Sequence, residues 1–180
     1  DEMEAAAHEF VSNMREGDRG AVIRFSDDVF VAQEFTDDLA AVDSAINGPE
    51  PFGATALYDA VAQSATLIQA ETNRKAIVLL TDGVDIGSTT PRDTAIARAA
   101  SSRAPYFVIG LGLDLDTLFL TEVASQTGGE LFFAPDPSDL AAIYEEIGQT
   151  IFVDINQFDD LIVQFTAPSD KDIASVRFEY

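Results

Sequence analysis

The chain has 180 residues and a formal net charge of −22, from 32 acidic and 10 basic residues. An acidic surface repels the phosphates of nucleic acids and of anionic lipids, so binding to either is disfavoured as a function. The chain has no cysteine, which excludes disulfides, thiolate chemistry and cysteine-based zinc sites.

The first half of the chain predicts a helix, two strands and two further helices. Apolar residues recur at helical spacing from Met3 to Met14, which indicates an amphipathic helix over residues 2–16. The apolar run 21–25 is typical of a buried strand, and the alternation over 29–35 is typical of an edge strand. Two more helical stripes follow, separated by a loop rich in glycine and proline, at 37–47 and 57–68.

The second half alternates regularly between strands and helices. Its strands are short, continuous apolar runs, as expected for strands buried on both faces. Its helices begin at capping residues, because side-chain oxygens and proline suit the first turn. In chain order these elements are strand 76–80, a helix with Thr90 as N-cap and Pro91 in its first position, strand 106–111, helix 116–126, strand 131–134, and a helix that opens at Asp136 and Pro137 and reaches Ile147.

Strands that alternate with helices predict an α/β fold with a mainly parallel, doubly wound sheet covered by helices on both faces. The tail differs, because residues 161–167 and 174–180 alternate in polarity and flank a turn at 168–170. This pattern predicts an antiparallel β-hairpin after the last helix. We therefore expect one domain over residues 1–152 and a hairpin extension over residues 153–180.

Five ordered segments resemble the von Willebrand factor type A family. They are EGDRGAVIRFS at 16–26, GATALYD at 53–59, RKAIVLLTDG at 74–83, VIGLG at 108–112 and TGGELFF at 127–133. The order and spacing match the family over roughly residues 2–150, and the hairpin resembles an extension seen in some bacterial members. The resemblance implies a Rossmann-like sheet with a metal-ion-dependent adhesion site beyond the carboxyl ends of its strands.

The resemblance also implies which residues hold the metal ion. Thr55 matches the family's threonine, and Asp82 in the Thr-Asp-Gly segment matches its aspartate. The family's Asp-x-Ser-x-Ser motif and the first strand that precedes it have no counterpart in residues 1–20. Mg²⁺ takes near-octahedral oxygen ligands, so Mg²⁺ or Mn²⁺ is expected to bind only weakly to this chain alone.

Other interpretations of these residues stay open at this point. Thr55 could instead be the N-cap of the helix that begins near residue 56. Asp82 could be a turn residue held by its own backbone contacts. Asp85 is expected to be a solvated loop acid, and the single histidine, His8, a surface or boundary residue without a zinc or catalytic role. Asp114 and Asp116 are expected in an exposed loop before a helix.

The absent strand would be central in the family's sheet, between the strands at 21–25 and 76–80. Its absence leaves two rows of backbone groups without partners, each at a cost of about 1–3 kcal/mol. We expect an upstream segment or a second polypeptide to supply the strand. Two alternatives are that strand 161–166 fills the gap, in its own molecule or swapped into a neighbour, and that the two halves of the sheet pair directly.

Together these features predict a protein-binding or adhesion module rather than an enzyme, at the cell surface, in the periplasm or outside the cell. The protein ligand is expected to be basic or to present a carboxylate to the metal, since an acidic surface attracts positive partners and divalent cations. A metal-independent structural or assembly module of the same fold is the alternative. No nucleophile, base or phosphate loop is placed convincingly for catalysis. No apolar run approaches the ~20 residues that span a bilayer.

Overall fold

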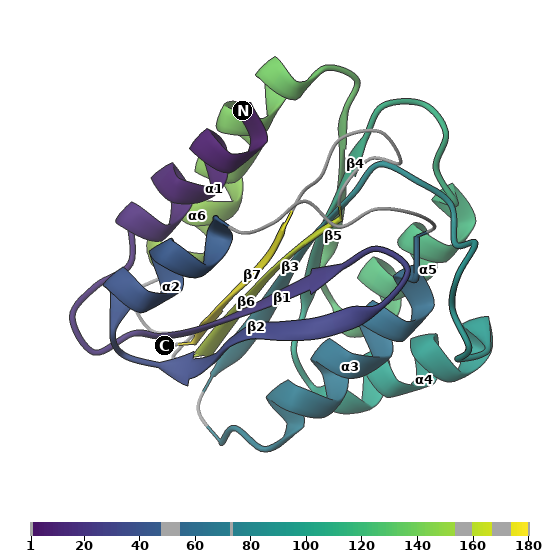
Figure 1. Cartoon of the computed structure of the whole chain (residues 1–180), viewed down its shortest axis with the longest axis horizontal. Coiled ribbons are helices and arrows are strands. Elements are labelled where there is room, and N and C mark those ends of the chain that lie inside the picture. Colours follow the sequence, from purple (N-terminus) through teal and green to yellow (C-terminus); the bar gives the residue numbers. More distant parts are fainter. Residues whose placement is uncertain (1, 48–54, 73, 154–159, 167–173, 180) are drawn as a thin grey trace.

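The computed structural model describes residues 2–47, 55–72, 74–153, 160–166 and 174–179 (Figure 1). Their strands form one sheet in the order β2-β1-β6-β7-β3-β4-β5. Strands β1, β3, β4, β5 and β6 run parallel where they pair, and β2 pairs antiparallel with β1 at the edge of the sheet. The strand bounds are β1 Arg19–Phe25, β2 Val29–Thr36, β3 Lys75–Thr81, β4 Tyr106–Leu111, β5 Glu130–Ala134, β6 Asp160–Thr166 and β7 Ala174–Glu179.

Helices cover both faces of the sheet, as Figure 1 shows. On one face lie α1 (Glu2–Ser12), α2 (Leu39–Ile46), the 3-10 helix η1 (Pro137–Asp139), α6 (Leu140–Gly148) and, following α6, the π-helical turn η2 (Gln149–Val153). On the other face lie α3 (Leu57–Gln69), α4 (Arg92–Ser102) and α5 (Thr117–Thr127). The predicted Rossmann-like α/β fold is therefore confirmed.

Strand β3 shows why the sheet needs both helical layers. Its side chains alternate between the two faces: Val78 and Leu80 pack with the α1, α2 and α6 layer, and Ile77 and Leu79 pack with the α3, α4 and α5 layer. All four side chains are fully buried. Each apolar side chain removed from water in this way contributes roughly 1.5–3 kcal/mol, so the two layers stabilise the sheet jointly.

The predicted capping residue Asp136 is confirmed, and an aspartate and a glycine also bound α5. Asp136 accepts a hydrogen bond from the Ser138 backbone N–H and forms a capping box with Asp139. Asp116 caps α5, and Gly128, with φ of 79°, ends it in the left-handed conformation that glycine adopts without strain.

Two predicted helix boundaries are wrong. Helix α4 begins at Arg92 with Pro91 as N-cap, so Thr90 is not the cap. The reason is long-range: the Asp59 carboxylate accepts the backbone N–H of Thr90, which holds this residue in the preceding loop. Helix α1 ends at Ser12 rather than at residue 16, because the chain turns there and reaches β1 through Gly17, whose φ is 100°.

The space between β1 and β3 is filled by the two C-terminal strands, drawn in yellow in Figure 1. Strand β6 is parallel to both neighbours, with Val163 opposite Val22 of β1 and Val78 of β3. Strand β7 is antiparallel to β6 and also pairs with β1, where Val176 is opposite Val22. The described part of the chain thus follows the predicted alternative in which 161–166 fills the gap in its own molecule.

In this structure β6 and β7 take the position at which an upstream segment or a second polypeptide was expected. A tethered segment is present at a high effective concentration, which favours it over a separate molecule. The predicted hairpin pairing of the two tail segments is confirmed, but the hairpin joins the main sheet. The division of the chain at residue 152 stays a prediction.

Candidate functional site

The candidate site lies at the edge of the sheet where parallel strands end. Thr81 of β3 is in register with Gly110 of β4, so the loops that follow these two strands leave the sheet side by side. The loop after β1 reaches the same edge, because the Ser26 carbonyl accepts a 2.6 Å hydrogen bond from the backbone N–H of Ala56. Open α/β sheets bind their ligands beyond the carboxyl ends of their strands.

Thr55 is buried at this edge, with 6% of its surface exposed. Its carbonyl accepts the backbone N–H groups of Ile86 and Gly87, at 2.9 and 3.2 Å. Its hydroxyl lies against Gly83, since a Cβ atom added to that glycine would be 3.2 Å from Thr55 Oγ1. The N-cap of α3 is Ala56, so the interpretation of Thr55 as the helix cap is wrong.

Asp82, the residue before Gly83, is half-buried. Its Oδ1 atom is buried and has no hydrogen-bond partner among the residues that the structure describes. Burial raises the pKa of Asp82 to about 6, and a hydrogen bond to its own backbone opposes the rise only partly. The alternative interpretation, a turn residue held by its own backbone, therefore accounts for only part of this environment. A carboxylate in this state is stabilised by a positive charge placed beside it.

Two further carboxylates hold the loop that carries Asp82. Asp85 Oδ1 accepts hydrogen bonds from the Tyr58 backbone N–H, at 3.0 Å, and from the Ser88 hydroxyl. The interpretation of Asp85 as a solvated loop acid is therefore wrong, because the residue is half-buried and engaged. Asp59 accepts the backbone N–H groups of Thr89 and Thr90, both at 2.8 Å. Burial alone would raise the pKa of Asp59, but the hydrogen bonds from these threonines outweigh it and lower the pKa.

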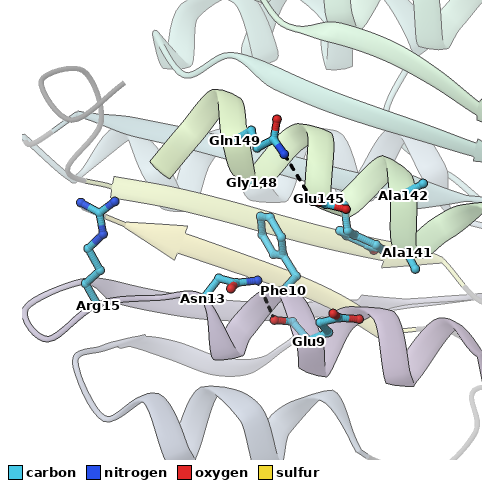
Figure 2. A pocket seen from close by; sticks show the side chains of 10 residues that line it. Glu9, Phe10, Asn13, Arg15, Ala141, Ala142, Glu145, Gly148 and Gln149 are labelled. Carbon is cyan, nitrogen blue, oxygen red and sulfur yellow. Dashed lines mark hydrogen bonds between the residues drawn. The ribbon is translucent and has the colours of Figure 1, made fainter. Parts of the chain in front are cut away.

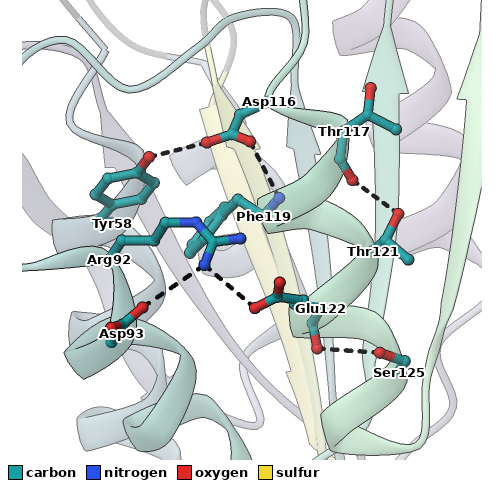
Figure 3. A network of polar contacts seen from close by, with 9 residues as sticks. All are labelled: Tyr58, Arg92, Asp93, Asp116, Thr117, Phe119, Thr121, Glu122 and Ser125. Carbon is teal, nitrogen blue, oxygen red and sulfur yellow. Dashed lines mark hydrogen bonds and ion pairs between the residues drawn. The ribbon is translucent and has the colours of Figure 1, made fainter.

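A polar network joins the starts of α3, α4 and α5 at this edge (Figure 3). The Tyr58 hydroxyl donates to Asp116 Oδ2 at 2.9 Å, and Asp116 Oδ1 accepts the Phe119 backbone N–H. Burial and the bonded Asp116 raise the pKa of Tyr58 to about 12, which keeps its hydroxyl a donor at neutral pH. Arg92 pairs with Glu122 at 3.2 Å over the Phe119 ring. The network fixes the framework around the site and leaves Asp82 outside it.

The other candidates from the sequence have structural or surface positions. His8 Nδ1 lies 2.6 Å from Asp43 Oδ1, and this contact joins α1 to α2. His8 is part-buried, as predicted. Asp114 is exposed in the loop after β4. Within the described ranges, no three or more histidine, cysteine, aspartate and glutamate side chains form a cluster suited to a metal ion.

A hollow of about 590 Å³ lies between α1 and α6, away from this edge (Figure 2). The ring centroids of Phe10 and Tyr144, which both line the hollow, are 5.3 Å apart. No residue from the loops after β1, β3 or β4 lines it. Its lining residues are Glu9, Phe10, Asn13, Arg15, Ala141, Ala142, Tyr144, Glu145, Gly148 and Gln149.

A smaller hollow, of about 360 Å³, adjoins the site through Gly87, whose N–H is bonded to Thr55. Asp27, Asp28 and Asp59 line it together with Arg98 of α4. Mixed charge and open polar walls are what a solvated surface groove presents, so this hollow adds acidic character to the edge.

Comparison with known proteins identifies a family model. Residues 1–84 match the model of the von Willebrand factor type A domain, a stretch that contains Thr55 and Asp82. Among curated protein sequences, none matches the chain.

Several solved structures have a similar fold. A von Willebrand factor type A protein from Catenulispora acidiphila has a TM-score of 0.75 at 19% identity, over 98% of this chain and 51% of that one. This chain thus spans about half the length of that protein. The von Willebrand factor domain of the type V pili tip protein Mfa5 from Porphyromonas gingivalis has a TM-score of 0.70 at 17% identity, over 87% and 89% of the two chains. These likenesses establish the fold.

A third similar structure carries a metal. It is proximal thread matrix protein 1 from the mussel byssus, with a zinc-occupied MIDAS motif, the abbreviation for a metal-ion-dependent adhesion site. Its TM-score is 0.70 at 22% identity, over 83% of this chain and 39% of that one.

None of the helices in the described ranges of this chain has the length and apolarity to cross a membrane.

Proposed function

We propose that this chain, whose residues 1–84 match the model of the von Willebrand factor type A domain, is a protein-binding module. Its binding edge takes a divalent cation at Thr55 and Asp82. The observation that carries the proposal is the Asp82 Oδ1 atom, buried without a hydrogen-bond partner among the described residues. The Thr55 hydroxyl lies against Gly83, one residue further along the chain.

These two residues fit a hard cation in donor type. Mg²⁺ and Mn²⁺ prefer carboxylate, hydroxyl and water oxygens, and Asp82 and Thr55 offer one carboxylate and one hydroxyl. The cation would supply the positive charge that the half-buried carboxylate lacks, and it would attract an acidic group of a protein ligand. Because two side chains leave most ligand positions to water, binding by this chain alone is expected to be weak.

The partner is a protein, either basic or offering a carboxylate to the cation. The formal net charge of −22 favours a partner with complementary charge. Two of the similar structures come from a pilus tip and from a byssal thread matrix. On that basis we place the module at a bacterial cell surface, in the periplasm or outside the cell, and assign it no enzymatic role.

A second candidate is a structural or assembly module of the same fold that binds partners without metal. One observation favours it: the described residues contain no cluster of three or more acidic or histidine side chains suited to an ion. The two candidates differ in a single measurable property, the dependence of binding at this edge on a divalent cation.

Calorimetric titration of Mg²⁺ and of Mn²⁺ into the whole chain tests the proposal, at a salt concentration that screens the acidic surface. We expect weak, saturable binding at one site. Asp82→Ala is expected to abolish it, and Thr55→Val to weaken it at least about tenfold, since one ligand of few is lost. Asp114→Ala removes an exposed carboxylate in the loop after β4 and is the matched control. Binding that Asp82→Ala leaves unchanged would reject the cation site and favour the metal-independent module.

A further inference from the structure

Most of the large apolar side chains that the described residues expose lie at one edge of the molecule. Val84 and Ile86 belong to the loop after β3 and are 42% and 72% exposed. Leu113, in the loop after β4, is 91% exposed, and Leu118, in the first turn of α5, is 66% exposed. Exposed aliphatic side chains gathered in one place mark interaction surfaces, whereas scattered ones need no explanation.

The framework of the fold holds these four side chains near one another. β3 and β4 are adjacent and parallel, so their following loops start together. Tyr58 joins the two loops, because its backbone N–H donates to Asp85 and its hydroxyl donates to Asp116 (Figure 3). The loop after β3 is held further by the Thr55 carbonyl, which accepts the N–H of Ile86. We call Val84, Ile86, Leu113 and Leu118 the aliphatic rim.

Acidic side chains lie on the same two loops as the aliphatic rim. Asp114 is exposed to solvent, and Asp82, Asp85 and Asp116 are part-buried. The nearby cation, Arg92, is paired with Glu122. Aliphatic side chains and carboxylates on one surface complement a partner surface that combines aliphatic side chains with lysine or arginine, because each component then meets its favourable counterpart.

We propose that the aliphatic rim docks a protein segment in which aliphatic residues alternate with lysine or arginine. This inference rests on the proposed function, which makes this edge the protein-binding face. It adds the chemistry of the partner. It does not require the cation. The aliphatic side chains contribute binding free energy through removal from water, and the carboxylates select the charge of the partner and speed its approach.

The test measures binding of short peptides of equal length to the whole chain by fluorescence anisotropy. In the first peptide leucine alternates with lysine, in the second leucine alternates with glutamate, and in the third serine alternates with lysine. We expect the leucine–lysine peptide to bind at least about tenfold more tightly than either of the others, since it alone matches both components. Equal binding of the serine–lysine peptide would overturn the role of the rim, and equal binding of the leucine–glutamate peptide would overturn the charge requirement.

Matched variants locate the binding. The double variant Ile86→Ser, Leu113→Ser is expected to weaken the leucine–lysine peptide at least about tenfold. Phe30→Ser is the control, because Phe30 is also exposed, at 44%, but lies on the edge strand β2 at the far end of the strand order from β4. Equal effects of the two changes would overturn the proposal. Circular dichroism checks that both variants fold, and Mg²⁺ titration of the double variant separates the two proposals, since rim substitutions are expected to leave cation binding intact.

Discussion

A chain that ends at Val153 is expected to lose its folded state as a monomer. Removal of β6 and β7 leaves the facing edges of β1 and β3 without partners, and both strands are almost completely buried. Each buried backbone group that loses its partner costs about 1–3 kcal/mol. Several such losses exceed the ~5–15 kcal/mol by which a typical domain is stable. Far-UV circular dichroism and size-exclusion chromatography of the truncated chain would show unfolding or association.

Single proline substitutions separate the two C-terminal strands. Val163→Pro removes a backbone donor from β6 at the position opposite Val22 and Val78. Val176→Pro does the same in β7, opposite Val22. Both strands lie inside the sheet, but β6 pairs with β1 and with β3 over several residues, whereas β7 pairs with β3 at one register position. Val163→Pro is therefore expected to be the more destabilising in urea titrations, by about 3 kcal/mol or more. A chain ending at Val153 that keeps full stability would refute the assignment of β6 to the centre of the sheet.

Asp82→Asn is expected to stabilise the protein at neutral pH in the absence of divalent cations. The pKa of Asp82 rises from 3.8 to about 6 on folding because the side chain is desolvated. Between these two values the folded state keeps a proton that the unfolded state releases, so stability falls as the pH rises. Such a shift corresponds to at most about 3 kcal/mol. Partial exposure of the side chain reduces the expected gain at pH 7.5 to about 1–2 kcal/mol.

Denaturant titration of both proteins at pH 4 and at pH 7.5 measures this gain. The difference should nearly vanish at pH 4, where the folded protein already carries the proton on Asp82. Asp114→Asn, at an exposed position, is the control and should change stability by less than about 0.5 kcal/mol at either pH. Added Mg²⁺ should stabilise the native protein and not the Asp82→Asn variant, because binding to the folded state alone raises its stability. A variant that is less stable than the native protein at pH 7.5 would contradict the expectation.

Periodicity and capping chemistry predict most of this fold because they are local. The apolar run at 76–80 and the Asp136–Pro137 pair are read directly from the sequence, and the strand and the helical turn that they predict are found there. Thr90 illustrates the limit of local signals. Its position before a proline is typical of a helix cap, but the carboxylate of Asp59, far away in the chain, binds its backbone instead. No local pattern contains that contact.

The candidate site, like the fold, is predicted from the sequence only in part. Thr55 and Asp82 are found through resemblance to a family motif, and the fold places the Thr55 hydroxyl beside the Asp82–Gly83 turn. The unpaired Asp82 oxygen depends on burial, which the sequence does not give. Sequence patterns miss the role of Asp85 because its partner Tyr58 is 27 residues away. They also leave three choices open for the centre of the sheet, since strand pairing over long sequence separations has no local signal.

The most direct test of the cation-assisted edge is a ¹H–¹⁵N NMR titration with Mn²⁺, whose unpaired electrons broaden the signals of nearby amides. We expect early broadening at Thr55 and at Asp82 to Gly87, no broadening on the α1 and α6 face, and loss of the broadening in Asp82→Ala. Broadening spread evenly over the acidic surface, or unchanged in the variant, would contradict a cation site at this edge.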